Sequence, residues 1–210
     1  MKPVWITPQT KILILGSYPW VKTLDKNNQS NDIITRRRNF LESQKEKKEP
    51  EYYSDNRNMF WSMLLWEDKK WIDYEEKIKF LQKNNIWLWD VFKYADREGS
   101  SDNAINLQKS EFNALYSFFL LFPHLKEIIF NWDTAFEYFK KYINATNTKN
   151  LLEKEGEKLF LNLPIWNWLV RKVKINTIYS TSWMSRVKVP REKRIARLEK
   201  TWLKKFIKNI

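Results

Sequence analysis

Cysteine is absent from this chain of 210 residues, and histidine occurs once, as His124. Without cysteine the chain cannot form a disulfide framework, a thiolate zinc site or a cysteine nucleophile. One histidine is too few for a multi-histidine metal site, and it leaves a single candidate base for a Ser-His-Asp triad. The lack of cysteine also fits a protein of a reducing cytoplasm.

Glycine and long apolar runs are also scarce. The chain has three glycines, Gly16, Gly99 and Gly156, where average usage would be about 7%, so these positions are expected to serve the backbone. Gly16 ends a predicted strand, where a tight turn or a close ligand requires a residue without Cβ. Gly99 fits either that role or an ordinary turn. The longest apolar stretch, Leu115–Phe122, is too short to span a membrane, and Met1–Thr10 lacks the apolar run of a signal peptide. We therefore expect a cytoplasmic protein with no membrane partner.

Positive charge is abundant. The formal net charge of +13 favours a polyanion partner, nucleic acid before an anionic membrane, and solubility is the plainer alternative. Arg186–Ile210 alone contains ten Lys or Arg against two Glu. Within it, Pro190–Ile210 predicts one long, basic, amphipathic helix, because four apolar residues from Ile195 to Phe206 recur at spacings of three and four. Its cationic face is either solvated or in contact with phosphates.

Four short segments rich in β-branched and aromatic residues are predicted as buried strands. They are Lys11–Ser17, Asn85–Val91, Glu127–Trp132 and Asn176–Ser182. Apolar residues at helical spacing occupy Met59–Trp66, Trp71–Lys83, Glu111–Phe122 and Thr134–Tyr142. Strands alternating with helices indicate an α/β fold, whose mainly parallel sheet is covered on both faces and binds ligands at the carboxyl ends of its strands. The segment Asn144–Asn167 shows no regular pattern.

Five short stretches carry a resemblance to a known family. They are ILILGSYPW (Ile12–Trp20), YYSDNRNMFW (Tyr52–Trp61), WDVFKYADREGSSDNAI (Trp89–Ile105), IFNW (Ile129–Trp132) and YSTSWMS (Tyr179–Ser185). In this order they resemble motifs of the hypoxanthine-DNA glycosylase branch of the uracil-DNA glycosylase superfamily. The resemblance implies one domain, residues 1–210, folded as a three-layer α/β/α sandwich on a central four-stranded, mainly parallel sheet. It also implies a DNA glycosylase that needs neither a metal nor a cofactor, and we expect a monomer.

The chain departs from the family pattern at several positions near the expected pocket. Trp20 and Trp132 stand where the family has glycine, Asp55 and Asn56 replace His-Pro, and Trp183 and Met184 replace Pro-Ala. The basic segment Asp25–Pro50 is expected to be an insertion, because the family joins its first two motifs by a short loop. These changes bear on the identity of the base more than on the reaction.

The expected catalytic residues are Asn58 and Asp55. Cleaving a base from deoxyribose develops positive charge on the sugar and negative charge on the base, so the site must hold a water and place donors at the base. The resemblance implies that Asn58 is catalytic, and its amide oxygen could orient the water, although asparagine there also suits an N-cap of the helix from Met59. Asp55 could be a general base or a turn residue.

Further residues are expected to bind the base. By resemblance, Asn131 reads the edge of the flipped base. Gly16, Ser17 and Tyr18 would present backbone amides to the base or to a phosphate. The ring of Tyr18 or Phe60 could stack on the base, or pack in the core instead.

The end of the fourth predicted strand carries the expected DNA contacts. They are Ser180, Thr181, Ser182, Trp183, Met184, Arg186 and Lys188. The hydroxyl groups suit phosphate contacts. The tryptophan or the methionine could wedge into the base stack, although the tryptophan could instead be buried. The two basic residues would hold the flanking backbone.

Three functions fit these features. The first is removal of a deaminated base, hypoxanthine or uracil, in DNA repair, and the resemblance favours hypoxanthine. The second is the same reaction on a modified base, such as glucosylated hydroxymethylcytosine in phage DNA, as an antiviral defence; the changed pocket and the inserted basic segment motivate it. The third is a DNA-binding module that has lost catalysis, which the missing histidine and glycines of the motifs suggest.

Overall fold

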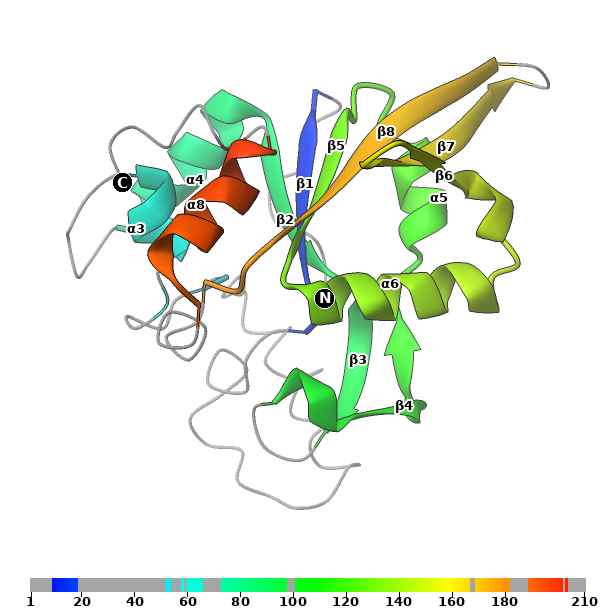
Figure 1. Ribbon diagram of the computed structural model, residues 1–210, viewed down its shortest axis with the longest axis horizontal. Helices are drawn as coiled ribbons and strands as arrows, with labels where there is room; N and C mark the ends of the chain where they lie inside the picture. The colour runs from blue at the N-terminus through cyan, green and yellow to red at the C-terminus, as the bar shows by residue number, and fades with distance from the viewer. Residues whose placement is uncertain are drawn as a thin grey trace.

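The centre of the protein is a six-stranded sheet in the order β2-β1-β5-β8-β7-β6 (Figure 1). The strands are β1 (Ile12–Gly16), β2 (Ile86–Asp90), β5 (Glu127–Asn131), β6 (Leu152–Glu155), β7 (Lys158–Trp166) and β8 (Leu169–Ile178). Strands β2, β1, β5 and β8 run parallel, and β7 and β6 extend the sheet antiparallel. This computed structural model describes residues 9–18, 52–53, 58, 60–65, 73–97, 101–166, 169–181, 189–201 and 203. The predicted α/β fold with four parallel strands is confirmed, and the whole sheet has two more strands.

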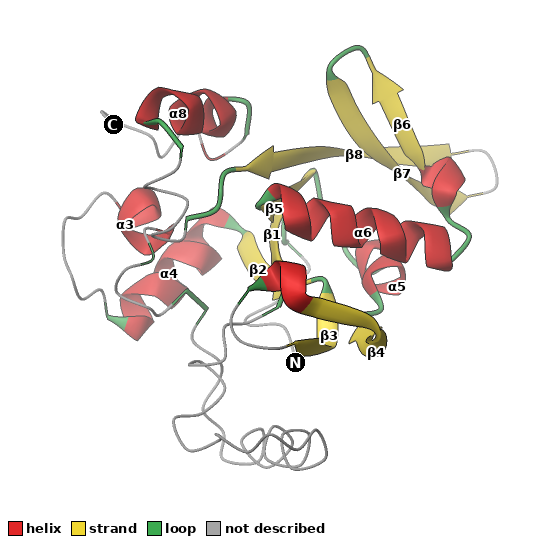
Figure 2. Ribbon diagram, turned by 60° about the horizontal axis from the view of Figure 1, so that its bottom comes forward, coloured by secondary structure: helices red, strands yellow, loops and turns green. Residues whose placement is uncertain are grey.

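Helices cover both faces of the sheet because its inner strands are apolar on both sides. On one face, Leu13 and Leu15 pack with side chains of α5 (Leu115–Leu120) and α6 (Asp133–Ala145). On the other face, Ile12 and Ile14 pack with side chains of α3 (Phe60–Leu65), α4 (Tyr74–Asn84) and α8 (Arg191–Glu199). Every residue of β1 and β2 is buried, as expected for parallel strands enclosed between two helical layers. The predicted three-layer sandwich is confirmed (Figures 1 and 2).

The strand predictions were incomplete outside the parallel core. Strands β3 (Phe92–Arg97) and β4 (Ile105–Phe112) form a separate antiparallel ribbon with irregular register. The segment predicted without pattern, residues 144–167, contains the end of α6, the short helix η2 (Lys149–Leu151), β6 and all of β7. The fourth predicted strand was misplaced: β8 starts at Leu169 and ends at Ile178, so Tyr179, Ser180 and Thr181 follow it in extended loop structure.

Two helix predictions were too long. The helix expected over Glu111–Phe122 begins at Leu115, because Glu111 and Phe112 belong to β4. The helix expected over Pro190–Ile210 begins after Pro190 but ends at Glu199. Thr201 ends it: its hydroxyl donates to the Leu198 carbonyl at 2.7 Å and accepts from the Leu203 amide at 3.1 Å. Residues 25–50 and 204–210 lie outside the described residues.

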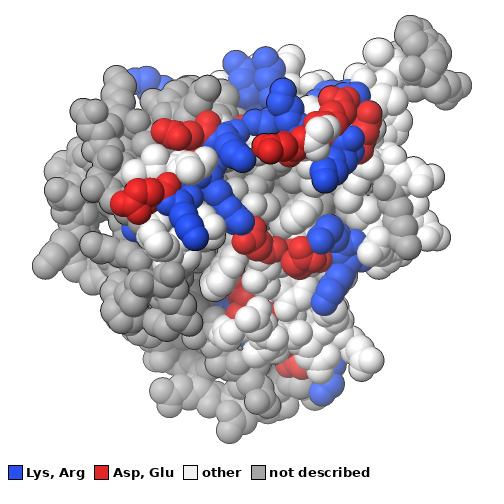
Figure 3. Space-filling view, viewed as in Figure 1, with Lys and Arg blue, Asp and Glu red and all other residues white. Residues whose placement is uncertain are grey.

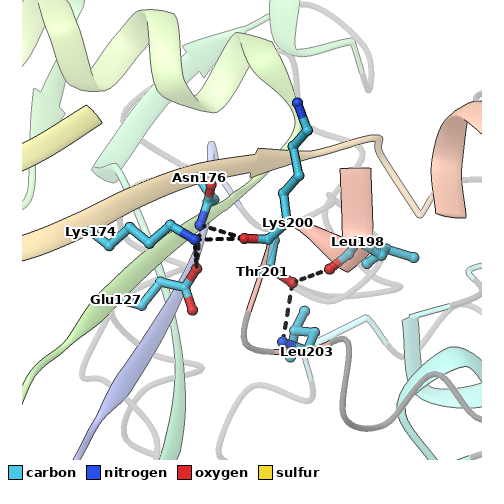
Figure 4. Close-up of polar contacts among 7 residues, drawn as sticks. All are labelled: Glu127, Lys174, Asn176, Leu198, Lys200, Thr201 and Leu203. Carbon is cyan, nitrogen blue, oxygen red and sulfur yellow. Dashed lines mark hydrogen bonds and ion pairs between the residues drawn. The ribbon is translucent and has the colours of Figure 1, made fainter. Parts of the chain in front are cut away.

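A polar cluster ties the end of α8 to the amino ends of the parallel strands (Figure 4). Lys174 Nζ donates to the Lys200 carbonyl at 2.6 Å, and Asn176 Nδ2 donates to the same carbonyl at 3.3 Å and to Glu127. A cation there also complements the partial negative charge at a helix C-terminus. The cluster thus fixes the C-terminal end of α8 near the amino ends of the strands. Among the helices described, none is long and apolar enough to cross a membrane.

Candidate functional site

Three side-chain positions meet at the carboxyl ends of β1, β2 and β5. Gly16 pairs with Asp90 in register, and β5 lies on the other side of β1 and ends at Asn131. Side chains alternate between the two faces of a strand, so Gly16, Asp90 and Asn131 share the face of Ile12, Ile14 and Ile129. That face is the one covered by α3 and by the preceding residues Tyr52 and Tyr53.

Gly16 is required by the close approach of other side chains. A Cβ at this position would lie 2.7 Å from Asp90 Oδ1 and 3.3 Å from Tyr53 Oη. The first distance is shorter than any non-bonded contact that a carbon atom tolerates, so a larger residue would displace the carboxyl group. The crowding expected at Gly16 therefore comes, in this structure, from Asp90 and Tyr53 of the same chain.

Asp90 is a carboxyl group enclosed by aromatic residues, and it is only 3% exposed. Burial raises the pKa of Asp90 from its ordinary value of 3.8 to about 7, against the lowering effect of a hydrogen bond from Tyr52. The negative charge of Asp102 raises this pKa further, and the positive charge of Arg97 lowers it. The group therefore changes its protonation state near neutral pH.

Tyr53 separates Phe60 from the strand ends. The Tyr53 and Phe60 rings stack with centroids 4.1 Å apart, and Trp61 meets the Phe60 ring edge-on at 5.1 Å. Phe60 is fully buried, so the structure places it in the core, and Tyr53 rather than Phe60 is the aromatic ring beside Gly16. Tyr53 adopts φ 57° in a turn, and burial together with the nearby Asp90 charge raises the pKa of its hydroxyl.

Asn58 caps helix α3. Its Oδ1 accepts a hydrogen bond from the Phe60 backbone amide at 2.9 Å, which is the geometry of the capping alternative. Capping uses one lone pair of the oxygen, and the amide retains a second lone pair and two N–H donors. A cap and a catalytic role are therefore compatible. Asn58 is linked to the strand ends through Phe60 and Tyr53.

Asn131 is held by the segment that follows β8. Its Nδ2 donates to Thr181 Oγ1 at 3.2 Å, and its Oδ1 accepts from the Thr181 backbone amide at 3.3 Å. Ser180 and Thr181 are both buried. The sequence prediction that these strand ends converge is thus realised by direct hydrogen bonds between Asn131 and Thr181.

The ion pair of Arg97 and Asp102 lies close to the segment that carries Ser17 and Tyr18. Arg97 Nη1 donates to Asp102 Oδ1 at 2.8 Å, and the guanidinium lies 5.5 Å from the centroid of the Tyr18 ring. The Tyr138 hydroxyl donates to the Asp102 carbonyl at 2.6 Å. Burial and the Asp90 charge raise the pKa of Tyr18 to about 12. Tyr18 is therefore neutral at physiological pH and packed against a fixed cation.

Six of the sequence-predicted site residues belong to segments that the structure does not describe. Asp55, Ser182, Trp183, Met184, Arg186 and Lys188 lie outside the described residues. Within the described ranges there is no group of three His, Cys, Asp or Glu side chains that could hold a metal ion.

Sequence reasoning missed Asp90 and Tyr53, together with the Arg97–Asp102 pair. A signal for Asp90 was present, since a carboxylate ends a predicted strand that is otherwise apolar, and Gly16 ends the neighbouring predicted strand. Charged side chains are seldom fully buried without a partner or a function. The position of Tyr53 was not predictable in this way, because its turn is set by contacts with Phe60.

Comparison with known proteins identifies relatives of the chain. It is 32% identical over 160 residues to a hypoxanthine DNA glycosylase of Methanosarcina barkeri, spanning 73% of this chain and 84% of the relative. It is also 32% identical over 140 residues to a hypoxanthine DNA glycosylase of Methanosarcina acetivorans, spanning 65% of this chain and 72% of the relative. No protein-family model matches the chain.

A solved structure has the same fold. It is the solution NMR structure of a candidate uracil DNA glycosylase from Methanosarcina acetivorans, with a TM-score of 0.56 and 24% sequence identity. The match covers 96% of this chain and 91% of that chain. At this level of sequence identity, the structural similarity supports the fold alone.

Proposed function

Since this chain belongs to the hypoxanthine-DNA glycosylase branch of the uracil-DNA glycosylase superfamily and is a DNA glycosylase, we propose that it excises hypoxanthine from DNA. The observation that supports the proposal is the meeting of Gly16, Asp90 and Asn131 with Tyr53 at the carboxyl ends of three strands. Open α/β sheets bind their ligands at this edge. Hypoxanthine arises when adenine loses its amino group, so its removal serves DNA repair.

The base must leave the helix before its glycosidic bond is accessible. Enzymes of this kind rotate the nucleotide out of the stack and read the base by hydrogen bonds and aromatic contacts. In our proposal the Asn131 amide reads the edge of the base, and the hydrogen bonds to Thr181 keep that amide in one orientation. The Tyr53 hydroxyl lies close to Asn131, and the rings of Tyr18 and Tyr53 are the aromatic surfaces that we expect to contact the base.

Backbone groups after β1 supply a rigid, uncharged frame for the base. The carbonyls of Gly16 and Ser17 accept hydrogen bonds from the amides of Val91 and Phe92 at 2.9 and 3.0 Å. These bonds fix the segment that leads into Tyr18. Donors and dipoles held in place before the reaction stabilise developing charge without reorganisation.

Asn58 orients the attacking water in this proposal. An amide cannot act as a strong base, but its oxygen accepts a hydrogen bond from a water that adds to C1′ of the sugar as the base departs. The cap on Phe60 fixes the position of that oxygen. The start of α3 thereby holds in place the Asn58 oxygen that orients the water.

The proposal predicts that Asn58→Ala abolishes excision and leaves DNA affinity largely unchanged. We expect the single-turnover rate to fall by roughly 100-fold or more, as when one fixed polar contact is removed from an active site. The rate is measured by scoring abasic sites in an oligonucleotide duplex, and the affinity by fluorescence anisotropy.

Asn58→Ser is the matched control, because serine retains the capping oxygen while the amide is lost. The alanine variant is expected to lose about 1 kcal/mol of stability with the cap, whereas the serine variant is expected to keep it. A serine variant that excises as fast as the wild type would assign Asn58 to helix capping alone.

The base specificity is tested on duplexes that carry hypoxanthine, uracil or glucosylated hydroxymethylcytosine, with no metal added. Release of hypoxanthine in preference to the other two supports the proposal. Release of only the bulky cytosine derivative would instead favour the defence function. Tight binding without release of any base would indicate a binding module.

A further inference from the structure

Three buried polar atoms at the ends of β1 and β2 lack hydrogen-bond partners among the described residues. They are Asp90 Oδ2, Tyr53 Oη and Ser17 Oγ. Asn131 lies beside Tyr53 Oη and Asp102 lies beside Ser17 Oγ at looser hydrogen-bonding geometry, so Asp90 Oδ2 is the atom most clearly left for a ligand. Each buried polar atom left unsatisfied destabilises the folded state by roughly 1–3 kcal/mol. A buried carboxylate oxygen left in this way is characteristic of a site whose partner is a ligand.

These atoms are also in the place where the base is proposed to bind. Asp90 Oδ1 and Tyr53 Oη both lie against Gly16, within 3.3 Å of the position of its missing Cβ. Asp90 is on the same face and at the same edge of the sheet as Asn131. Of the three groups, the Asp90 carboxylic acid, whose pKa is raised to about 7, is the one that can release a proton in the neutral pH range.

We propose that Asp90 is the general acid of this site: it binds a ring nitrogen of the flipped purine, N3 or N7, and donates its proton there as the base leaves. The inference rests on the proposed function and extends it to the leaving-group half of the reaction. A purine departs more readily as a neutral molecule than as an anion, and proton donation by a positioned acid accelerates such steps by roughly 10²–10⁴-fold.

Cleavage of the glycosidic bond conserves both its electron pair and the proton of Asp90. The C1′–N9 bond breaks, its electron pair stays with the purine, and the Asp90 proton moves to the purine nitrogen. The water oriented by Asn58 forms the new bond to C1′ and loses a proton, which returns to the Asp90 carboxylate through solvent. The net reaction is the nucleotide plus water giving an abasic sugar and free hypoxanthine.

The surroundings of Asp90 keep the acid protonated near neutral pH. The groups that face it are Tyr52 and Tyr53 before α3, Tyr18 after β1, Arg97 on β3 and Asp102 beyond it. Burial and the Asp102 charge favour the neutral acid, while Tyr52 and Arg97 favour the carboxylate. The balance leaves the pKa of Asp90 at about 7, which suits an acid that must donate and recover a proton in each cycle.

The first test compares the wild type with Asp90→Asn, which preserves shape and neutrality but has no acidic proton. We expect the single-turnover rate on hypoxanthine DNA to fall roughly 10²–10⁴-fold. The wild-type rate should fall tenfold per pH unit above about 7, and the variant should show no such decline. Asp96→Asn, on the adjacent strand β3 (Phe92–Arg97), is the control and should keep both the rate and the pH profile.

The second test uses substrates that lack one ring nitrogen. On DNA containing 3-deaza- or 7-deazahypoxanthine, the ratio of the wild-type rate to the D90N rate should collapse to near one for whichever analogue lacks the acceptor. This ratio cancels the intrinsic reactivity of the analogue. A variant that merely distorts the site would instead keep the same ratio on all three bases.

The outcomes separate this inference from the proposed function. A wild-type enzyme that releases no hypoxanthine would overturn both. If hypoxanthine is released but D90N keeps the wild-type rate and pH profile, or the rate ratio is equal on all three bases, the role of Asp90 is refuted and the proposed function stands. A pH decline lost in D90N and a ratio that collapses on one analogue support the assignment.

Discussion

Trp132 adopts a backbone conformation that glycine adopts far more readily. Its φ and ψ are 116° and 150°, a region that is essentially restricted to glycine and costs other residues on the order of 1–3 kcal/mol. The residue directly follows Asn131, and its indole is 38% exposed. In the family that the chain resembles, this position is glycine. The tryptophan therefore places backbone strain directly beside Asn131.

The strain predicts an unusual order of stability for two substitutions. Trp132→Gly and Trp132→Ala both remove the indole, but only glycine relieves the backbone. We therefore expect the glycine variant to be more stable than the alanine variant by about 1 kcal/mol, after allowing for the greater entropy that glycine gains on unfolding. Urea unfolding of the two variants measures the difference. Equal stabilities, or alanine above glycine, would contradict the strain.

At the residue scale, the sequence predicted which strand ends converge but not how they are joined. Asn131 and Thr181 were expected at the same edge because parallel strands end together. Asp90 was overlooked since a polar residue at the end of a strand is usually exposed, and it is enclosed by residues from other segments, Tyr52 and Tyr53 among them. Such enclosure depends on contacts between distant segments, which no local pattern encodes.

At the level of elements, Arg197 joins α8 to the two strand ends that carry Asn131 and Thr181. Its Nη1 lies 2.8 Å from both carboxylate oxygens of Asp133, the first residue of α6. The guanidinium also lies 4.0 Å from the centroid of the Tyr179 ring, which follows β8. One side chain thus connects three elements around the site.

Loss of this connection is expected to destabilise the protein modestly. Arg197→Ala should lower the free energy of unfolding by about 1 kcal/mol, since a half-exposed ion pair and a cation–π contact each contribute less than that. Urea unfolding measures the change. Lys193→Ala removes an exposed cation from the same helix and should change the stability by less than about 0.5 kcal/mol. If the two variants are equally stable, Arg197 does not hold these elements together.

The elements that sequence predicted well are those with the simplest surroundings. Strands β1, β2 and β5 are buried on both faces, so their apolar runs are distinctive. Strand β7 was missed although Leu161 and Leu163 alternate toward the core, because Phe160 and Pro164 interrupt the alternation. Strand β7 also pairs antiparallel with both β8 and β6, and pairing partners cannot be deduced from one segment.

At the scale of the whole molecule, several basic side chains of the described residues are engaged in ion pairs. On the side seen in Figure 3, basic and acidic side chains are interspersed. Arg197 pairs with Asp133, Lys172 with Glu153 and Glu155. The cationic face predicted for the last helix is therefore partly occupied by internal ion pairs, and Arg197 in particular is engaged within the protein.

Global stability should decrease as the pH rises from about 4 to 7, because Asp90 holds a proton in the folded state that the unfolded chain has already released. Its pKa is raised from 3.8 to about 7 on folding, so its contribution is complete below about pH 4, declines from pH 4 to 7, and is lost above pH 7. The shift corresponds to an upper limit on the order of 4 kcal/mol.

Asp90→Asn isolates this contribution, since an amide does not titrate. We expect the variant and the wild type to have similar free energies of unfolding near pH 4, and the variant to become the more stable protein by pH 8. Urea titrations at unit steps of pH measure the gap, and Asp96→Asn should follow the wild-type curve. Parallel curves for D90N and the wild type would mean that Asp90 ionises in the folded protein as freely as in water. In that case Asp90 would be ionised at neutral pH and could not donate a proton to the departing base. The experiment therefore links the stability of the molecule to the chemistry of its site.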